Sequence, residues 1–113
     1  MESFAQIKYL RSTARKARLV ADAVRGKMVG EALSLLELSI NKKVAEDVSK
    51  TIKSAVANMQ SKHTETTIAV DELRIKEIRV DNGPVMKRFR PRAKGSASGI
   101  IKRMCHISVT VAN

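Results

Sequence analysis

The stretch from residue 79 to residue 103 reads Arg79-Val-Asp-Asn-Gly-Pro-Val-Met-Lys-Arg-Phe-Arg-Pro-Arg-Ala-Lys-Gly-Ser-Ala-Ser-Gly-Ile-Ile-Lys-Arg103. It has turn-forming residues at both bends, and after Asp81 it contains no acidic residue. Repulsion among its cations, together with a shortage of apolar side chains, keeps such a segment from packing on itself in water. The stretch therefore predicts an arm that is embedded in a polyanion, and nucleic acid carries phosphate charge at the close spacing that such an arm needs.

Charge outside this stretch is distributed unevenly. The whole chain has a net charge of +11; residues 1–27 carry seven basic and two acidic side chains, residues 28–78 seven and eight, and residues 79–113 eight and one. Two basic ends that flank a neutral middle indicate a small body with charged contact surfaces. Phe89, Pro91 and Gly95 interrupt the cations of the arm, and arginine predominates at its centre, where a planar guanidinium suits phosphates and stacked bases.

Length and composition indicate one small domain. At 113 residues the chain has room for a single domain, 1–113, with a body at 1–79 and 102–113 and an arm at about 80–101. Only Phe4, Tyr9 and Phe89 are aromatic, so we expect an aliphatic core. No apolar run approaches the roughly 20 residues that span a bilayer. Without a secretory signal, and with Cys105 as the lone cysteine, we expect a soluble intracellular protein.

Apolar periodicity predicts one strand and three helices in the first half. Alternation over residues 5–11 predicts the strand, and Ser12 or Thr13 is expected to cap a helix that Gly26 ends. A short helix over 31–38 should bury Leu33, Leu36 and Ile40. A longer helix should follow Asn41 as N-cap. The expected apolar stripe of the first helix is Ala14, Ala17, Ala21 and Val24, and that of the long helix is Ala45, Val48, Ile52, Ala55, Val56 and Met59.

The second half predicts strands. After a polar loop at 62–67, Leu73 and Ile75 alternate in one phase and Ile78 and Val80 in the other, which indicates a β-bulge or a change of buried face. The last strand should bury Cys105, Ile107, Val109 and Val111 and direct His106, Ser108 and Thr110 to the other side. A ribbon over 80–101 would reach roughly 30 Å. We therefore expect an α+β fold in which three helices pack on a small three-stranded antiparallel sheet with a long, protruding basic β-hairpin.

The residue pattern offers no catalytic constellation. Cys105 and His106 are neighbours on a predicted strand, so their side chains face opposite ways and form neither a nucleophile–base pair nor a shared metal site. The residues Gly26-Lys-Met-Val-Gly30 lack the spacing of a phosphate-binding loop. We therefore predict no enzymatic activity, no metal and no cofactor.

Four motifs together resemble one known family. The run at residues 83–95 closely resembles the hairpin of the large-subunit ribosomal protein family numbered twenty-two, and residues 102–111 resemble its last strand. Residues 15–27 resemble its first helix, and Asn41-Lys42-Lys43 resembles the start of its long helix. This sequence departs from the family at Ser96, where another basic residue is usual, and at Cys105, where a hydroxyl residue is usual.

The resemblance implies a structural protein of the large ribosomal subunit, here expected on cytoplasmic ribosomes, although the residues do not separate a bacterial from an organellar source. Such proteins hold domains of large-subunit (23S-type) ribosomal RNA together and join early in assembly, with the hairpin in the wall of the nascent-peptide exit tunnel. The implied partners are this RNA, neighbouring large-subunit ribosomal proteins, and the nascent polypeptide and macrolides near the hairpin tip.

The resemblance and the charge pattern together predict the site residues. The expected RNA-binding residues are Arg11, Arg15, Lys16, Arg18, Arg25, Lys27, Lys87, Arg88, Arg90, Arg92, Lys94, Lys102, Arg103 and His106. The expected tunnel-facing tip consists of Met86, Lys87, Arg88, Phe89 and Arg90. Gly83, Gly95 and Gly99 are expected to allow tight bends or close approaches of the backbone to RNA. Pro84 and Pro91 should lie at bulges or edges. Phe89 either stacks on an unpaired base or fills space against a sugar.

Two other classes of protein remain open at this point. A DNA-bending architectural protein also uses long basic β-arms, but it needs a dimer interface, for which the aliphatic stripes leave little surplus. An RNA-modifying enzyme would need a catalytic site that the residues do not provide.

Overall fold

The computed structural model describes residues 2–39, 41–62, 72–91, 93–95 and 97–113. Its elements follow one another as β1 (Glu2–Leu10), α1 (Ala14–Val24), α2 (Val29–Glu37), α3 (Lys42–Lys62), β2 (Arg74–Pro91), the 3-10 turn η2 (Ala93–Gly95) and β3 (Ala97–Ala112). The strands form an antiparallel sheet in the order β1-β3-β2. The predicted α+β fold with a long β2–β3 hairpin is confirmed.

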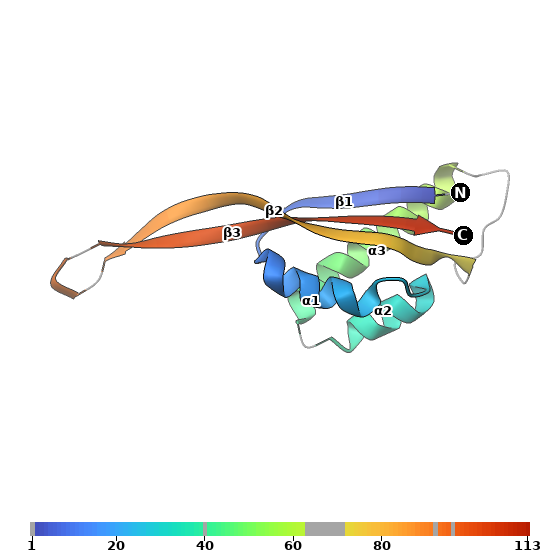
Figure 1. Cartoon of the computed structure of the whole chain (residues 1–113), viewed down its shortest axis with the longest axis horizontal. Helices are drawn as coiled ribbons and strands as arrows, with labels where there is room; N and C mark the ends of the chain where they lie inside the picture. The colour runs from blue at the N-terminus through green and yellow to red at the C-terminus, as the bar shows by residue number, and fades with distance from the viewer. Residues whose placement is uncertain (1, 40, 63–71, 92, 96) are drawn as a thin grey trace.

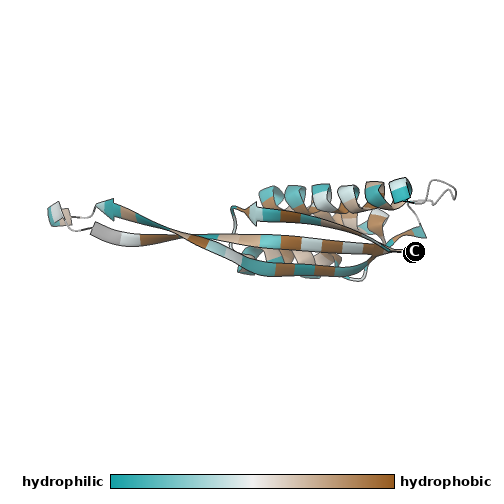
Figure 2. Cartoon of the chain, turned by 90° about the horizontal axis from the view of Figure 1, so that it is seen from above, coloured by the Kyte–Doolittle hydropathy of each residue, from teal (hydrophilic) through white to brown (hydrophobic). Residues whose placement is uncertain are grey.

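The three helices cover one face of the sheet, and the hairpin extends far beyond them (Figure 1). Figure 2 shows the same arrangement from above, with α3 beside the sheet and the paired ends of β2 and β3 projecting alone. The molecule is accordingly elongated, with extents of 67 × 26 × 15 Å. A body of helices and sheet thus carries a projection that is only two strands wide.

Helix α1 forms as its sequence predicts. The Thr13 hydroxyl accepts a hydrogen bond from the backbone N–H of Lys16 at 3.4 Å, which makes Thr13 the N-cap. Gly26 follows the helix with φ at +76°, the left-handed conformation that ends many helices. The predicted stripe is buried, and Val20 joins it. Its alanines allow the helix to lie close to the sheet.

Helix α2 begins earlier than its sequence predicts, and the reason is a contact with the sheet. The Val29 N–H donates to the Leu73 carbonyl at 3.0 Å, and the Ile75 N–H donates to the Lys27 carbonyl at 2.9 Å. This pairing positions the chain for a helix that starts at Val29 and not at residue 31. The helix buries Val29, Ala32 and Leu36, while Leu33 is half-buried. The prediction for Ile40 lies outside the described residues.

Helix α3 and the sheet supply the rest of the core. The entire predicted stripe of α3 is buried, and Val44 and Thr51 lie with it. The register of β2 against β3 shifts between Ile75 and Glu77, which confirms the predicted bulge and keeps Leu73, Ile75, Ile78 and Val80 all buried. The alternation of β3 is confirmed as well. The loop predicted at 62–67 lies outside the described residues, except that Lys62 ends α3.

The core is aliphatic, as predicted. Phe4, Tyr9 and Phe89 have exposed fractions of 50%, 59% and 80%.

Strand β1 runs from Glu2 to Leu10 and not over 5–11. Its register against β3 shifts between Ile7 and Leu10. Tyr9 lies in this irregularity with φ at +59°, a conformation unusual for a bulky residue. Nothing in the pattern of residues 5–11 predicted this irregularity.

Candidate nucleic-acid interface

The arm is the hairpin beyond the body, residues 85–91 of β2 and 97–103 of β3. Seven ladder pairs join its strands, from Val85 opposite Arg103 to Pro91 opposite Ala97. The turn η2 lies between the strands, with Lys94 and Gly95 at positive φ. No side chain of the arm that the structure describes is buried. The arm is therefore held by its ladder and not by a core.

The predicted position of the hairpin tip is wrong. Residues 86–90 pair with residues 98–102, so they lie along the sides of the arm, and the turn at Ala93–Gly95 lies at its end. The left-handed conformation of Lys94 and Gly95 gives the chain its reversal there, which the basic run of residues 87–90 obscured in the sequence. Lys94 is thus the described cation at the tip, and Arg92 lies outside the described residues.

The two faces of the arm differ in character. Directly opposed residues share a face, and side chains alternate along each strand. One face carries all the large exposed apolar side chains of the arm that the structure describes, Val85, Phe89 and Ile101, together with Lys87 and Arg103. The other face carries Met86, Arg88, Arg90, Ile100 and Lys102. An RNA that surrounds the arm would therefore meet apolar surface chiefly on the first face.

A bulge separates the arm from the body. The register shifts between Asn82 and Val85, so Pro84 lies in a bulge, and Pro91 stands at the last pair of an edge strand, as predicted. A Cβ on Gly83 would lie 3.2 Å from the Met104 carbonyl group and 3.2 Å from the His106 ring. The close approach at Gly83 is therefore made to the protein's own strand β3.

The cations of α1 and of the segments that flank it divide into two groups. Arg18 donates from Nη2 to the Val80 carbonyl at 3.2 Å, and Arg25 donates from Nη2 to the Ile78 carbonyl at 3.0 Å while it pairs with Asp22. These carbonyls lie on β2, an edge strand, so the two arginines bind the helix to an open sheet edge. The Lys27 Nζ lies 3.8 Å from the Glu31 Oε1 and forms an ion pair with it. Arg11, Arg15 and Lys16 have no ion pair among the described residues.

His106 has a structural partner that its sequence position did not indicate. Its Nδ1 accepts a hydrogen bond from the Tyr9 N–H at 3.0 Å, and the two rings meet edge to face at 5.0 Å. The imidazole thus supports the irregular conformation of β1 beside the root of the arm. Its predicted contact with a phosphate stays a prediction.

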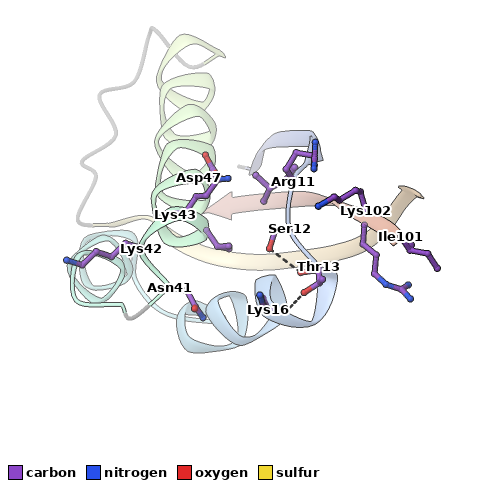
Figure 3. A pocket seen from close by; sticks show the side chains of 13 residues that line it. Arg11, Ser12, Thr13, Lys16, Asn41, Lys42, Lys43, Asp47, Ile101 and Lys102 are labelled. Carbon is purple, nitrogen blue, oxygen red and sulfur yellow. Dashed lines mark hydrogen bonds between the residues drawn. The ribbon is translucent and has the colours of Figure 1, made fainter. Parts of the chain in front are cut away.

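A cavity of about 760 Å³ opens where the arm leaves the body. We call it the arm-root groove. Its side chains come from the end of β1, the β1–α1 connection, the first turn of α1, the start of α3 and strand β3 (Figure 3). Its lining comprises Leu10, Arg11, Ser12, Thr13, Lys16, Asn41, Lys42, Lys43, Val44, Asp47, Ile101, Lys102 and Arg103. Six of these residues are cations and one is an acid.

The six groove cations share one property. None of them has an ion pair among the described residues, whereas Arg25, Lys27, Lys50, Lys76 and Arg79, which lie outside the groove, all contact carboxylates. Lys42 and Lys43 were interpreted from sequence as part of a solvated helix face. The only signal was the motif Asn41-Lys42-Lys43, which could not show that it lies beside residues 11–16 and 101–103.

The described part of the chain contains no cluster of three or more histidine, cysteine or acidic side chains that could hold a metal ion. Within the same residues, no helix combines the length and the apolar character that a membrane span requires.

Comparisons with known proteins match this chain to a family and to a similar protein. The family described as ribosomal protein L22p/L17e matches residues 5–112. The chain is also 53% identical over 111 residues to the large ribosomal subunit protein uL22 of Bdellovibrio bacteriovorus, a match that covers 98% of this chain and 97% of that protein.

Proposed function

Since this chain belongs to the ribosomal protein L22p/L17e family, and is thereby a protein of the large ribosomal subunit, we propose that it binds large-subunit ribosomal RNA through its arm and its arm-root groove. We further propose that this ribosome is cytoplasmic and that the protein has a structural and not an enzymatic role. Its partners are the RNA and the neighbouring large-subunit proteins.

One observation carries the proposal: the described cations of the arm have no carboxylate partners. They are Lys87, Arg88, Arg90, Lys94, Lys102 and Arg103, and none forms an ion pair among the described residues. An exposed two-stranded hairpin is at best marginally stable in water, and concentrated positive charge destabilises it further. Phosphates on both sides of the arm would neutralise that charge and release counterions.

The length of the molecule supports a role in assembly. The arm-root groove and the turn η2 lie at opposite ends of the arm, in a molecule with a longest extent of 67 Å. Cations at both ends can bind phosphates of RNA segments that otherwise repel one another. We propose that the protein joins such segments early in subunit assembly.

The shape of the arm supports a place in the wall of the nascent-peptide tunnel. A projection two strands wide can pass between RNA helices where a globular body cannot (Figure 1). We propose that the end of the arm borders the tunnel, near nascent polypeptides and bound macrolides. Because the turn lies at Ala93–Gly95, the residues proposed to border the tunnel are those of the turn and the nearest part of the segment 86–90.

Sucrose-gradient sedimentation tests the RNA-binding role. We expect the protein to co-sediment with large subunits and to remain bound at moderate salt. The double variant Arg88→Ala/Arg90→Ala should dissociate at lower salt than the charge-matched variant Lys53→Ala/Lys62→Ala, whose lysines lie on α3 away from the arm. A protein that binds DNA as a dimer and stays off the subunit would contradict the proposal.

A deletion tests the tunnel role. Removing Met86-Lys87-Arg88 takes away no core contact, so we expect near-normal subunit profiles in cells that carry only the deleted form. An odd number of lost residues moves Phe89 and Arg90 to the opposite faces of the arm. The expected result is altered erythromycin tolerance. Loss of subunits with unchanged tolerance among the surviving ribosomes would mean that the arm is an assembly contact only.

A further inference from the structure

The lining of the arm-root groove contains more than cations. Its lining includes the nearly buried side chains of Leu10 and Val44 and that of Ile101, which is 53% exposed. Asn41 and Asp47 add polar oxygens. A contact surface for bare phosphate would need cations alone. This groove combines positive charge, apolar surface and hydrogen-bond acceptors, which is the combination that a nucleotide requires.

The acid in the groove is informative. Asp47 has no ion pair among the described residues, although six cations line the same cavity. A carboxylate repels a bare oxyanion, but it accepts hydrogen bonds from the amino groups of bases and from the ribose 2′-hydroxyl. Asp47 therefore favours a ligand that carries donors as well as phosphates.

The size of the groove selects between forms of RNA. Its volume of about 760 Å³ falls within the range of roughly 300–1,000 Å³ that is typical of sites for small molecules. A double helix presents its phosphates on the outside of a broad rod and cannot place a base in such a cavity. Unpaired nucleotides in a loop or bulge can turn their bases outward.

We infer that the arm-root groove is a binding site for a short unpaired segment of RNA, with phosphates on its cations and a base against Leu10, Val44 and Ile101. This inference rests on the proposed function for the identity of the polyanion. It assigns Lys43, Asn41 and Asp47 to the RNA interface. It also ties the start of α3 to the root of the arm through a shared ligand.

The first test removes two groove cations. Lys16→Ala/Lys43→Ala changes two exposed lysines that lie on different helices at the groove, whereas Figure 3 shows Lys42 directed away from the opening. The control is Lys53→Ala/Lys62→Ala, which removes the same charge from exposed positions of α3 outside the groove. Circular dichroism should show the same fold in both variants.

Fluorescence anisotropy with a single-stranded oligoadenylate and a blunt RNA duplex gives the readout. Each phosphate contact contributes a counterion-release factor of about five at 0.1 M salt, so the groove variant should bind oligoadenylate roughly 25-fold more weakly, while its salt slope falls by about 1.4. The control should change far less, and both variants should bind the duplex equally. Equal losses of oligoadenylate binding in the two variants, or an equal loss for duplex and single strand, would overturn the inference.

The second test concerns Asp47. If this carboxylate is only a counter-charge, Asp47→Ala should strengthen the binding of every anion. The inference predicts tighter binding of tripolyphosphate but weaker binding of oligoadenylate. Tighter binding of both would overturn it, and so would an acidic peptide that competes as strongly as oligoadenylate.

The two levels of proposal fail separately. If the protein co-sediments with large subunits but the two lysine variants bind oligoadenylate equally well, the groove site is excluded and the proposed function stands. If the groove variant alone loses oligoadenylate binding but the protein does not co-sediment with the subunit, the proposed function is excluded and the groove site stands.

Discussion

The arginines of α1 and of its C-cap differ in function because their side chains contact different surroundings. Arg18 and Arg25 bind backbone carbonyls of β2, whereas Arg15 projects into solvent without an ion pair among the described residues. A guanidinium suits the first task because its several N–H groups lie in one plane and its charge persists at any physiological pH. Positive charge in α1 is therefore partly structural.

Alanine substitutions should separate these tasks. Arg18→Ala should lower the free energy of unfolding by about 1 kcal/mol, since it removes a charge-assisted hydrogen bond that is partly exposed to water. Arg15→Ala should leave stability unchanged and weaken RNA binding. Urea denaturation and RNA titration measure the two effects, and equal destabilisation by both substitutions would contradict the division.

Cys105 predicts a stability change at alkaline pH. Burial of its side chain in β3 raises the pKa of the thiol, and the charge of Arg18 opposes that shift. The unfolded chain therefore loses this proton at a lower pH than the folded protein, and stability falls as pH rises above roughly 8.5. Urea midpoints should decline less for Cys105→Val than for the wild type over this range, and parallel declines would exclude a contribution from Cys105.

Among the elements, the hairpin of β2 and β3 combines two different structures in continuous strands. Near the body, β3 lies between two strands and under helices, so Ile107 and Val109 are fully buried. Beyond the bulge at Gly83 and Pro84, the same strand has a single partner and no covering helix. Stability should therefore drop sharply along one strand.

Amide hydrogen exchange should detect this drop. In the protein without RNA, amides of residues 87–90 and 99–102 should exchange rapidly, because opening the arm exposes almost no apolar surface. Amides of residues 107–111 and of α3 should be protected, and they serve as the internal control. Comparable protection of the arm and α3 would show that the arm is stable by itself.

On the scale of the whole molecule, the described ion pairs all lie on the body, away from the arm. The described ion pairs lie within helices or along the sheet, such as Lys50 with Glu46 and Arg79 with Asp81. The cations of the arm and of the arm-root groove lack such partners among the described residues. Acidic side chains thus offset part of the positive charge of the body, but no described acidic side chain pairs with the cations of the arm and its root.

This separation predicts a steep salt dependence of RNA binding. If the arm and groove together neutralise about six phosphates, log K should fall against log salt with a slope near −4 to −5. Titrations at several salt concentrations measure the slope, and Arg88→Ala/Arg90→Ala should reduce its magnitude by about 1.5. A wild-type slope near −1 would mean that these cations are not the main contact.

The amino-acid sequence by itself determined the elements and the chemical character of the arm. Helical spacing predicted the buried stripe of α3, alternation predicted the buried face of β3, and the phase change after Ile75 predicted the bulge. These features are local, because the period of apolar residues reports which side of an element meets the core. The family resemblance rested on the same continuous motifs.

The tertiary structure alone decided how distant segments meet. The early start of α2 depends on Leu73, the partner of His106 is Tyr9, and the tip falls at Lys94 because the register of β2 against β3 sets where the ladder ends. The arm-root groove likewise needs Lys16, Lys43 and Lys102 to converge from three elements. Periodicity assigns a residue to a face, but only the packing of elements determines which faces come together, and at which register.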